Sequence, residues 1–173
     1  MTPGKDSGQY RRRLLRFCAV FIGLQLAVQA VYYGWLLGSG IFRDYMHFLG
    51  ASASALVRLT GRPVVCDGDT MRGAFEMSIR SGCDGIQAIA IFATAVLAFP
   101  SSWPRRIAGA SAGVVALLGV NILRIATLFL AGESWPQQFQ TLHVHVWPAV
   151  LMLCTIVLWV VWASRVAPVP RTA

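Results

Sequence analysis

Three residues that lie far apart in the sequence carry the side chains that acyl transfer requires: Cys83 in "SGCDGIQ", Arg124 in "NILRIATLFL" and His143 in "TLHVHVWP". A thiol attacks carbonyl carbons, an imidazole carries protons, and a guanidinium stabilises the oxyanion that the attack creates. The set predicts that Cys83 attacks a peptide carbonyl, that His143 passes a proton to the leaving amine, and that Arg124 supports the oxyanion or holds the scissile carbonyl.

The elements that must position these residues are membrane helices. Hydrophobic residues make up 56% of the 173-residue chain and charged residues only 13%, a balance that is rare in water-soluble domains. An apolar helix of about 20 residues crosses the hydrocarbon core of a bilayer. We therefore expect an all-α membrane protein, a single integral membrane domain over residues 1–173. Its four transmembrane helices are predicted at about 17–38, 83–100, 107–131 and 145–163.

A cleavable signal peptide is the alternative interpretation of the first apolar stretch. The segment "RRRLLR" precedes it, and "VQA" at 28–30 has the form of a cleavage site. The apolar stretch continues to Leu37, however, which is too far for the apolar region of a signal peptide. We expect a retained helix.

The distribution of Lys and Arg predicts the orientation. If the N-terminus is cytoplasmic, the inner segments carry nine basic residues against one acid, Asp6, whereas the outer segments are balanced. These basic residues are Lys5, Arg11, Arg12, Arg13, Arg16, Arg105, Arg106, Arg165 and Arg171. By the positive-inside rule both termini are cytoplasmic and Cys83 faces the outside. The net charge of +8 is explained by this topology and by contact with membrane lipids, so we expect no nucleic-acid partner.

The outer segment, residues 39–82, is predicted to contain two elements. Apolar residues within 44–59 are spaced as in an amphipathic helix lying along the membrane surface. After Gly61 and Pro63 the period changes, and alternation around Phe75, Met77 and Ile79 predicts a small β-hairpin. This segment is expected to cover the outer end of the helix bundle.

Cys83 is predicted to open the second membrane helix at its outer end. Unpaired backbone N–H groups and the helix dipole favour a negative charge there, so we expect a stabilised thiolate. Gly82 and Gly85 beside it would leave space for the backbone of a bound peptide.

Arg124 and the histidines are predicted at the same depth. Arg124 interrupts an apolar helix about five turns beyond Arg106, which places it near the outer interface. Asn121 lies one turn before it, on the same face, and is expected to orient the guanidinium. His143 and His145 precede the fourth helix. Because their rings would point about 200° apart on a helix, we expect no metal site, and no cofactor.

Simpler interpretations exist for each residue and for the whole protein. Cys83 alone would fit a packed or disulfide-bonded cysteine, and Arg124 alone a side chain that reaches the headgroups. A thiol-disulfide oxidoreductase using Cys66 and Cys83 is one alternative, although the chain has no Cys-x-x-Cys pair. A non-enzymatic membrane assembly protein is another, but it leaves an arginine in the hydrocarbon unexplained.

The segments "GCDGI" at 82–86, "NILRI" at 121–125 and "LHVHVW" at 142–147 resemble the Cys, Asn-x-x-Arg and His signatures of the exosortase/archaeosortase family. They occur in the usual order, over about residues 60–160, and the small size is similar to a short, exosortase H-like form. The resemblance implies a multi-pass cysteine transpeptidase of the bacterial cytoplasmic membrane. Its partners would be secreted proteins that end in a short motif, a transmembrane helix and a basic tail. The enzyme would cleave the substrate near the motif through a Cys thioester and pass the substrate to an acceptor.

Carried onto this chain, the resemblance implies that Cys83 is the nucleophile, Arg124 the transition-state stabiliser and His143 the acid/base. His143 is chosen over His145 because the family histidine generally precedes a helix start by about four positions, as His143 precedes Trp147.

One residue departs from the family pattern. Ser or Thr commonly follows the family cysteine, whereas Asp84 stands at that position here. A carboxylate beside Cys83 would raise the pKa of the thiol, unless Asp84 turns away to pair with Arg80 or His143. We expect Asn121, Asp84 and His145 to support the three catalytic residues without taking part in the bond changes themselves.

Overall fold

The computed structural model describes residues 3–166, which form helices and one small sheet. The helices are α1 (Pro3–Gly34), α2 (Gly40–Leu59), α3 (Ile86–Ala98), α4 (Trp103–Ser134), α5 (Pro136–Thr141) and α6 (Trp147–Val166). The strands are β1 (Val65–Asp67), β2 (Thr70–Arg72) and β3 (Glu76–Ser78). A 3-10 turn, Leu36–Gly38, joins α1 to α2, and a π-helical turn, Leu142–Val146, joins α5 to α6.

Within the described residues, three helical segments are long and apolar enough to cross a membrane: Arg11–Gly38, Trp103–Ser134 and Pro136–Val166. The fourth apolar helix, α3, has 13 residues. At about 1.5 Å per residue it is roughly 20 Å long, less than the ~30 Å of a hydrocarbon core. The prediction of a mostly helical, multi-pass membrane protein is confirmed. The count of four membrane-spanning helices is not, because the chain leaves the helical path on both sides of α3, at Gly85 and at Phe99.

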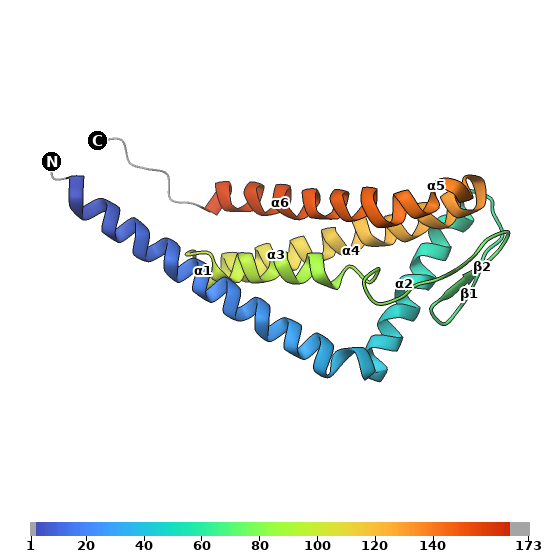
Figure 1. Ribbon diagram of the computed structural model, residues 1–173, viewed down its shortest axis with the longest axis horizontal. Coiled ribbons are helices and arrows are strands. Elements are labelled where there is room, and N and C mark those ends of the chain that lie inside the picture. Colours follow the sequence, from blue (N-terminus) through green and yellow to red (C-terminus); the bar gives the residue numbers. More distant parts are fainter. Residues whose placement is uncertain (1–2, 167–173) are drawn as a thin grey trace.

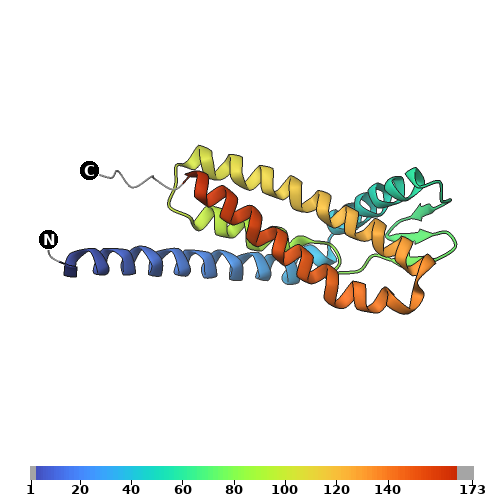
Figure 2. The same cartoon turned by 90° about the horizontal axis from the view of Figure 1, so that it is seen from above.

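Helix α3 is nevertheless part of the bundle. It packs against α1, α4 and α6, and Figure 1 shows α3, α4 and α6 running alongside one another with α1 inclined to them. The start of α1, the α3–α4 turn and the end of α6 lie at one end of the molecule, while α2, α5 and the sheet lie at the other (Figure 2). The chain therefore has two chemically distinct ends.

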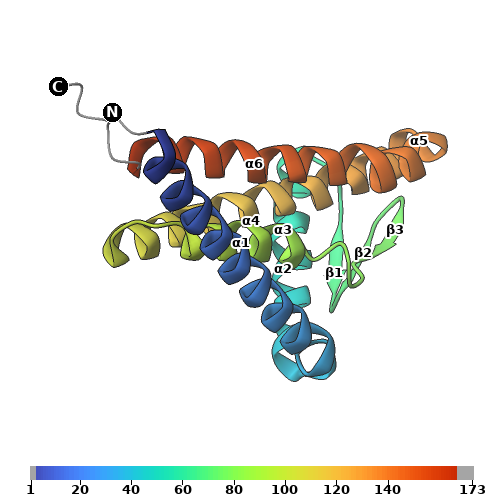
Figure 3. The same cartoon turned by 60° about the vertical axis from the view of Figure 1, so that its left-hand side comes forward.

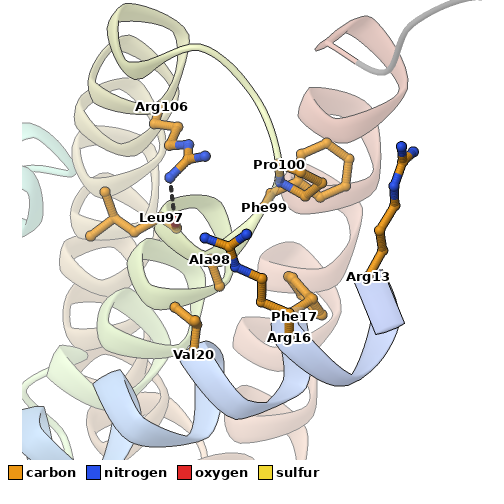
Figure 4. Close-up of a pocket in the computed structure, with 9 residues that line it drawn as sticks. All are labelled: Arg13, Arg16, Phe17, Val20, Leu97, Ala98, Phe99, Pro100 and Arg106. Carbon is orange, nitrogen blue, oxygen red and sulfur yellow. Dashed lines mark hydrogen bonds between the residues drawn. The ribbon is translucent and has the colours of Figure 1, made fainter. Parts of the chain in front are cut away.

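The end that contains the α3–α4 turn is rich in arginine. A cavity of about 580 Å³ opens there between α1 and the turn (Figure 4), and it is lined by Arg13, Arg16, Phe17, Val20, Leu97, Ala98, Phe99, Pro100 and Arg106. Arg106 donates to the carbonyl oxygens of Leu97 at 3.0 Å and Ser101 at 2.9 Å, which closes the turn. The lining offers cations and apolar surface but no nucleophile.

The predicted amphipathic helix is present as α2. Ser39 caps its start, because the Ser39 hydroxyl accepts the Phe42 N–H at 3.2 Å. One apolar side of α2 is covered by α4, β1 and β2 rather than by lipid, and its buried residues include Met46, Leu49, Ala53 and Val57. The other side leaves Ile41, Phe48, Leu56 and Leu59 exposed. The prediction was that the apolar face of this helix lies on the membrane. Only the exposed apolar side is free to do so, because the other side is packed inside the protein.

The predicted hairpin is a three-stranded antiparallel sheet in the order β1-β2-β3. Cys66 pairs with Met71, and Met71 pairs with Met77. The turn around Gly73, between β2 and β3, was missed because strands of three residues are too short to show an alternating pattern. Met71 is fully buried beneath the sheet, and Figure 3 shows the sheet beside α2 at the end of the bundle. The outer segment thus forms a compact cap.

Candidate active site

Cys83 lies in a tight turn that connects β3 to α3. Its N–H donates to the Arg80 carbonyl at 2.9 Å, and the glycines on either side of the Cys83–Asp84 pair have positive φ, 91° at Gly82 and 76° at Gly85. Such φ values are easily adopted only by glycine. The helix begins at Ile86, so the prediction that Cys83 opens it was wrong by three residues.

Asp84, rather than the thiol, occupies the N-terminus of α3. Its Oδ1 atom accepts the Ile86 N–H at 2.8 Å, and its Oδ2 atom accepts the Gly82 N–H at 3.0 Å and the Tyr32 hydroxyl at 2.6 Å. The residue is fully buried. The Asp84 carboxylate thus bonds to Tyr32 and two backbone groups; in the described structure it pairs with neither Arg80 nor His143.

Two tyrosines that the sequence did not indicate fix this turn to the neighbouring helices. Tyr32 reaches it from α1, and the Tyr45 hydroxyl on α2 donates to the Asp84 carbonyl oxygen at 2.7 Å. Burial, together with the adjacent Asp84 carboxylate, raises the pKa of Tyr45, so this hydroxyl keeps its proton and acts as a donor. The turn that carries Cys83 is held on both sides.

Asn121 holds the same turn from α4. Its Nδ2 atom donates to the Cys83 carbonyl oxygen at 3.3 Å. Asn121 therefore orients the cysteine backbone, whereas the sequence had predicted that it orients the Arg124 guanidinium. A Cβ atom on Gly85 would lie 2.7 Å from the Asn121 side chain. The space beside Gly85 is therefore filled by Asn121. Of the two glycines, only Gly82 leaves room for a peptide, because a Cβ atom added there would meet nothing within 4 Å.

The three predicted chemical groups come together around the sulfur atom. His143 Nε2 lies 2.7 Å from Cys83 Sγ, and Arg124 Nη2 lies 3.6 Å from it. Arg124 is buried on α4, whereas Cys83 and His143 are partly accessible. The ring of Phe139 stacks on that of His143 at 5.7 Å between centroids. His143 belongs to the π-helical turn, a feature that often marks functional sites.

His145 does not belong to this group. It is exposed, and it is absent from the residues that line the cavity at Cys83. Thus the described structure brings His143, and not His145, to the thiol.

The protonation state of Cys83 follows from its surroundings. Burial raises the pKa of the thiol, Arg124 lowers it through its charge and hydrogen bond, and Asp84 raises it; the net direction is upward. The sequence predicted a thiolate stabilised at a helix N-terminus, but that position is taken by Asp84. The resting group is a thiol with an imidazole nitrogen at hydrogen-bond distance, an arrangement in which a base removes the proton during attack.

The group opens into a cavity of about 360 Å³ with an apolar floor. Its walls come from β3, the Cys83 turn, α4, α5 and the π-helical turn. The lining residues are Phe75, Glu76, Met77, Ser78, Ile79, Arg80, Cys83, Arg124, Ile125, Leu128, Phe139, Gln140 and His143. A chain segment of a few residues fits such a space beside the sulfur.

Residues 3–166 contain neither a candidate metal-binding cluster nor a disulfide. No three His, Cys, Asp or Glu side chains gather there in a way that could hold a metal ion. Cys18, Cys66, Cys83 and Cys154 are all free, and Cys66 lies on β1 with its Sγ atom 3.4 Å from the Gly68 carbonyl oxygen.

These features define a multi-pass membrane protein with a cysteine, a histidine and a buried arginine grouped at one end. Residues 8–162 match the family model described as transmembrane exosortase. The chain belongs to this family, as its three motifs had suggested, and is thus related to membrane-embedded sorting enzymes. No curated protein and no solved structure matches it.

Proposed function

We propose that the protein is a membrane-embedded cysteine transpeptidase that cleaves the C-terminal sorting signals of secreted proteins. The observation that carries the proposal is the position of the Cys83 sulfur, 2.7 Å from His143 Nε2 and 3.6 Å from Arg124 Nη2. Family membership supports the same kind of activity. The alternatives of an oxidoreductase or an assembly protein account for neither of these distances.

In the first half of the proposed reaction, His143 Nε2 accepts the thiol proton as Cys83 Sγ attacks the carbonyl carbon of the scissile peptide. The carbonyl oxygen becomes an oxyanion, and the Arg124 guanidinium stabilises it. The tetrahedral intermediate then collapses: its C–N bond breaks, and His143 donates the proton to the leaving amine. The product is a thioester between Cys83 and the substrate.

In the second half, an acceptor nucleophile resolves the thioester. The nucleophile gives its proton to His143 and attacks the thioester carbonyl, and the Cys83 sulfur leaves and regains a proton from His143. Atoms and charges balance without a cofactor. An acceptor amine gives a transferred product, and water gives a hydrolysed one.

The proposed orientation places this site outside the cytoplasm. The arginine-rich end of the bundle (Figure 4) would face the cytoplasm of a bacterium, and Cys83 would face the opposite side of its inner membrane. Substrates would be exported proteins that end in a short motif, a transmembrane helix and a basic tail. That tail would lie at the cytoplasmic side, and the motif would reach the cavity at Cys83.

Co-expression with such a tailed protein tests the proposal. The wild type should release the tail, which is seen as a smaller product on a gel and identified by its mass. Cys83→Ala should abolish release without reducing the amount of enzyme in the membrane. Cys66→Ala is the matched control, since Cys66 is a second outer cysteine with no histidine beside it. Continued release by Cys83→Ala would refute the assignment.

A further inference from the structure

One wall of the cavity at Cys83 is a strand with an unpaired edge. The six consecutive residues 75–80 all line the cavity, and no residue of β1 or β2 does. Successive side chains of a strand point to opposite faces. A surface that touches all six residues must therefore run along the edge of β3, on the side away from β2.

The hydrogen bonds of the sheet show which backbone groups point to that edge. Ile79 N–H donates to the Asp69 carbonyl at 2.8 Å, and Gly73 N–H donates to the Phe75 carbonyl at 3.0 Å. In an antiparallel pair, such bonds involve every second residue. Phe75, Met77 and Ile79 thus direct their backbone groups to β2.

The intervening residues, Glu76 and Ser78, direct their N–H and C=O groups toward the cavity. In the described residues these four groups have no partner on that side, because β3 is the last strand of the sheet. An open strand edge is a ready template for another extended chain. Here the template stands inside the candidate active site.

We propose that the cleavage motif of the substrate binds as an added strand on the β3 edge, with its backbone bonded to Glu76 and Ser78. The proposal rests on the proposed function, since it supplies the way in which a peptide substrate is held. The two residues lie about 7 Å apart along a strand, so they pair with a peptide segment of three to four residues.

The geometry also indicates which side chains the motif would carry. An added strand shares the two faces of β3. One of them continues Phe75, Met77 and Ile79 onto the apolar floor that Ile125, Leu128 and Phe139 form. On the other face, the side chains of the added strand would lie next to the exposed polar residues Glu76, Ser78 and Arg80. The motif should therefore be extended and should alternate between apolar and polar residues.

The path of the chain places the scissile bond beyond the paired segment. Residues 79–82 lead directly from the end of β3 to Cys83, and all of the residues from 75 to 80 lie in the same cavity as the sulfur and Arg124. A peptide paired with Glu76 and Ser78 is thus in line with the three reacting groups.

Ser78→Pro tests the proposal, with Ser78→Ala as its control. Proline removes the N–H that points to the cavity and fills the edge with its ring, yet it leaves the bonds between β2 and β3 intact, and edge strands tolerate it. Alanine changes only the exposed side chain. Cleavage of a co-expressed protein with a motif, a transmembrane helix and a basic tail should be about tenfold or more slower with proline than with alanine, because only proline removes the backbone N–H. Equal rates for the two variants would overturn the proposal.

Amide hydrogen exchange gives a second test that needs neither cleavage nor a foldable proline variant. The Cys83→Ala protein is purified with and without the same tailed protein bound. The Glu76 and Ser78 amides should exchange more slowly in the complex. If the tailed protein is bound and these two amides exchange as before, the added strand is excluded. Binding without any cleavage by the wild type would instead count against the proposed function alone.

Discussion

The Sγ atom of Cys83 and the Nε2 atom of His143 lie 2.7 Å apart, although 60 positions separate the two residues in the chain. A turn before α3 presents the sulfur, and a π-helical turn before α6 presents the imidazole. Neither position follows from local sequence alone. The relationship arises because α3, α4 and α6 pack together, so that the turns before α3 and α6 share one cavity with Arg124 of α4.

His143→Gln is expected to lower the rate of tail release about 10²–10⁴-fold, the usual contribution of a general acid/base. Glutamine retains much of the shape but cannot carry the proton. His145→Gln should cleave at the wild-type rate, because His145 is exposed and outside the cavity. Initial rates of release in membranes measure both. A larger loss for His145→Gln would reverse the choice of histidine.

Arg124→Gln is expected to lower the rate about 10²–10³-fold by removing oxyanion stabilisation, and also to change the ionisation of Cys83. The guanidinium lowers the pKa of the thiol against the effect of burial, so its loss raises that pKa further. Alkylation of Cys83 by iodoacetamide, which requires the thiolate, should then rise only at higher pH than in the wild type. An unshifted alkylation curve would show that Arg124 does not act on the sulfur.

Tyr32→Phe is expected to destabilise the protein by about 1.5–3 kcal/mol, the range for hydrogen bonds to charged groups. It removes the hydroxyl that donates to Asp84 Oδ2 at 2.6 Å inside the protein. Tyr33→Phe is the matched control, because Tyr33 is adjacent and 66% exposed. Thermal unfolding in detergent compares the two. Equal unfolding temperatures would mean that the bond to Asp84 contributes nothing to stability.

Gly85→Ala is expected to cost about 1–3 kcal/mol of stability, because φ at Gly85 is 76° and the new Cβ would lie 2.7 Å from Asn121. Displacement of Asn121 also releases the Cys83 carbonyl, so tail release should slow. Gly119→Ala, on α4, should be neutral or slightly stabilising, because the added Cβ atom would meet nothing within 4 Å outside its own helix. An unaffected Gly85→Ala protein would contradict the role of Gly85 as a point of close approach.

Much of the fold follows from short-range patterns. Apolar length predicted four membrane-spanning helices, of which three are long enough in the structure, and the family motifs pointed to Cys83, Arg124 and His143. The start of α3 was misplaced because apolar length does not reveal a turn, although the glycines at 82 and 85 were a usable signal.

The contacts around Asp84 were not predictable in the same way. Tyr32 and Tyr45 reach Asp84 from 52 and 39 positions away. In the sequence, both stand where a tyrosine at the membrane–water interface would also be expected. Only the packing of α1 and α2 against the turn distinguishes these roles. The same holds for Asn121, which shares a helix face with Arg124 but bonds to the Cys83 backbone.

Mass spectrometry of the enzyme isolated from cells that express a tailed substrate tests the central claim most directly. The account predicts an acyl adduct on Cys83 alone, with a mass equal to the substrate up to its cleavage site, and removable by hydroxylamine as a thioester is. An adduct on another residue, or tail release by a protein that has alanine at position 83, would contradict it.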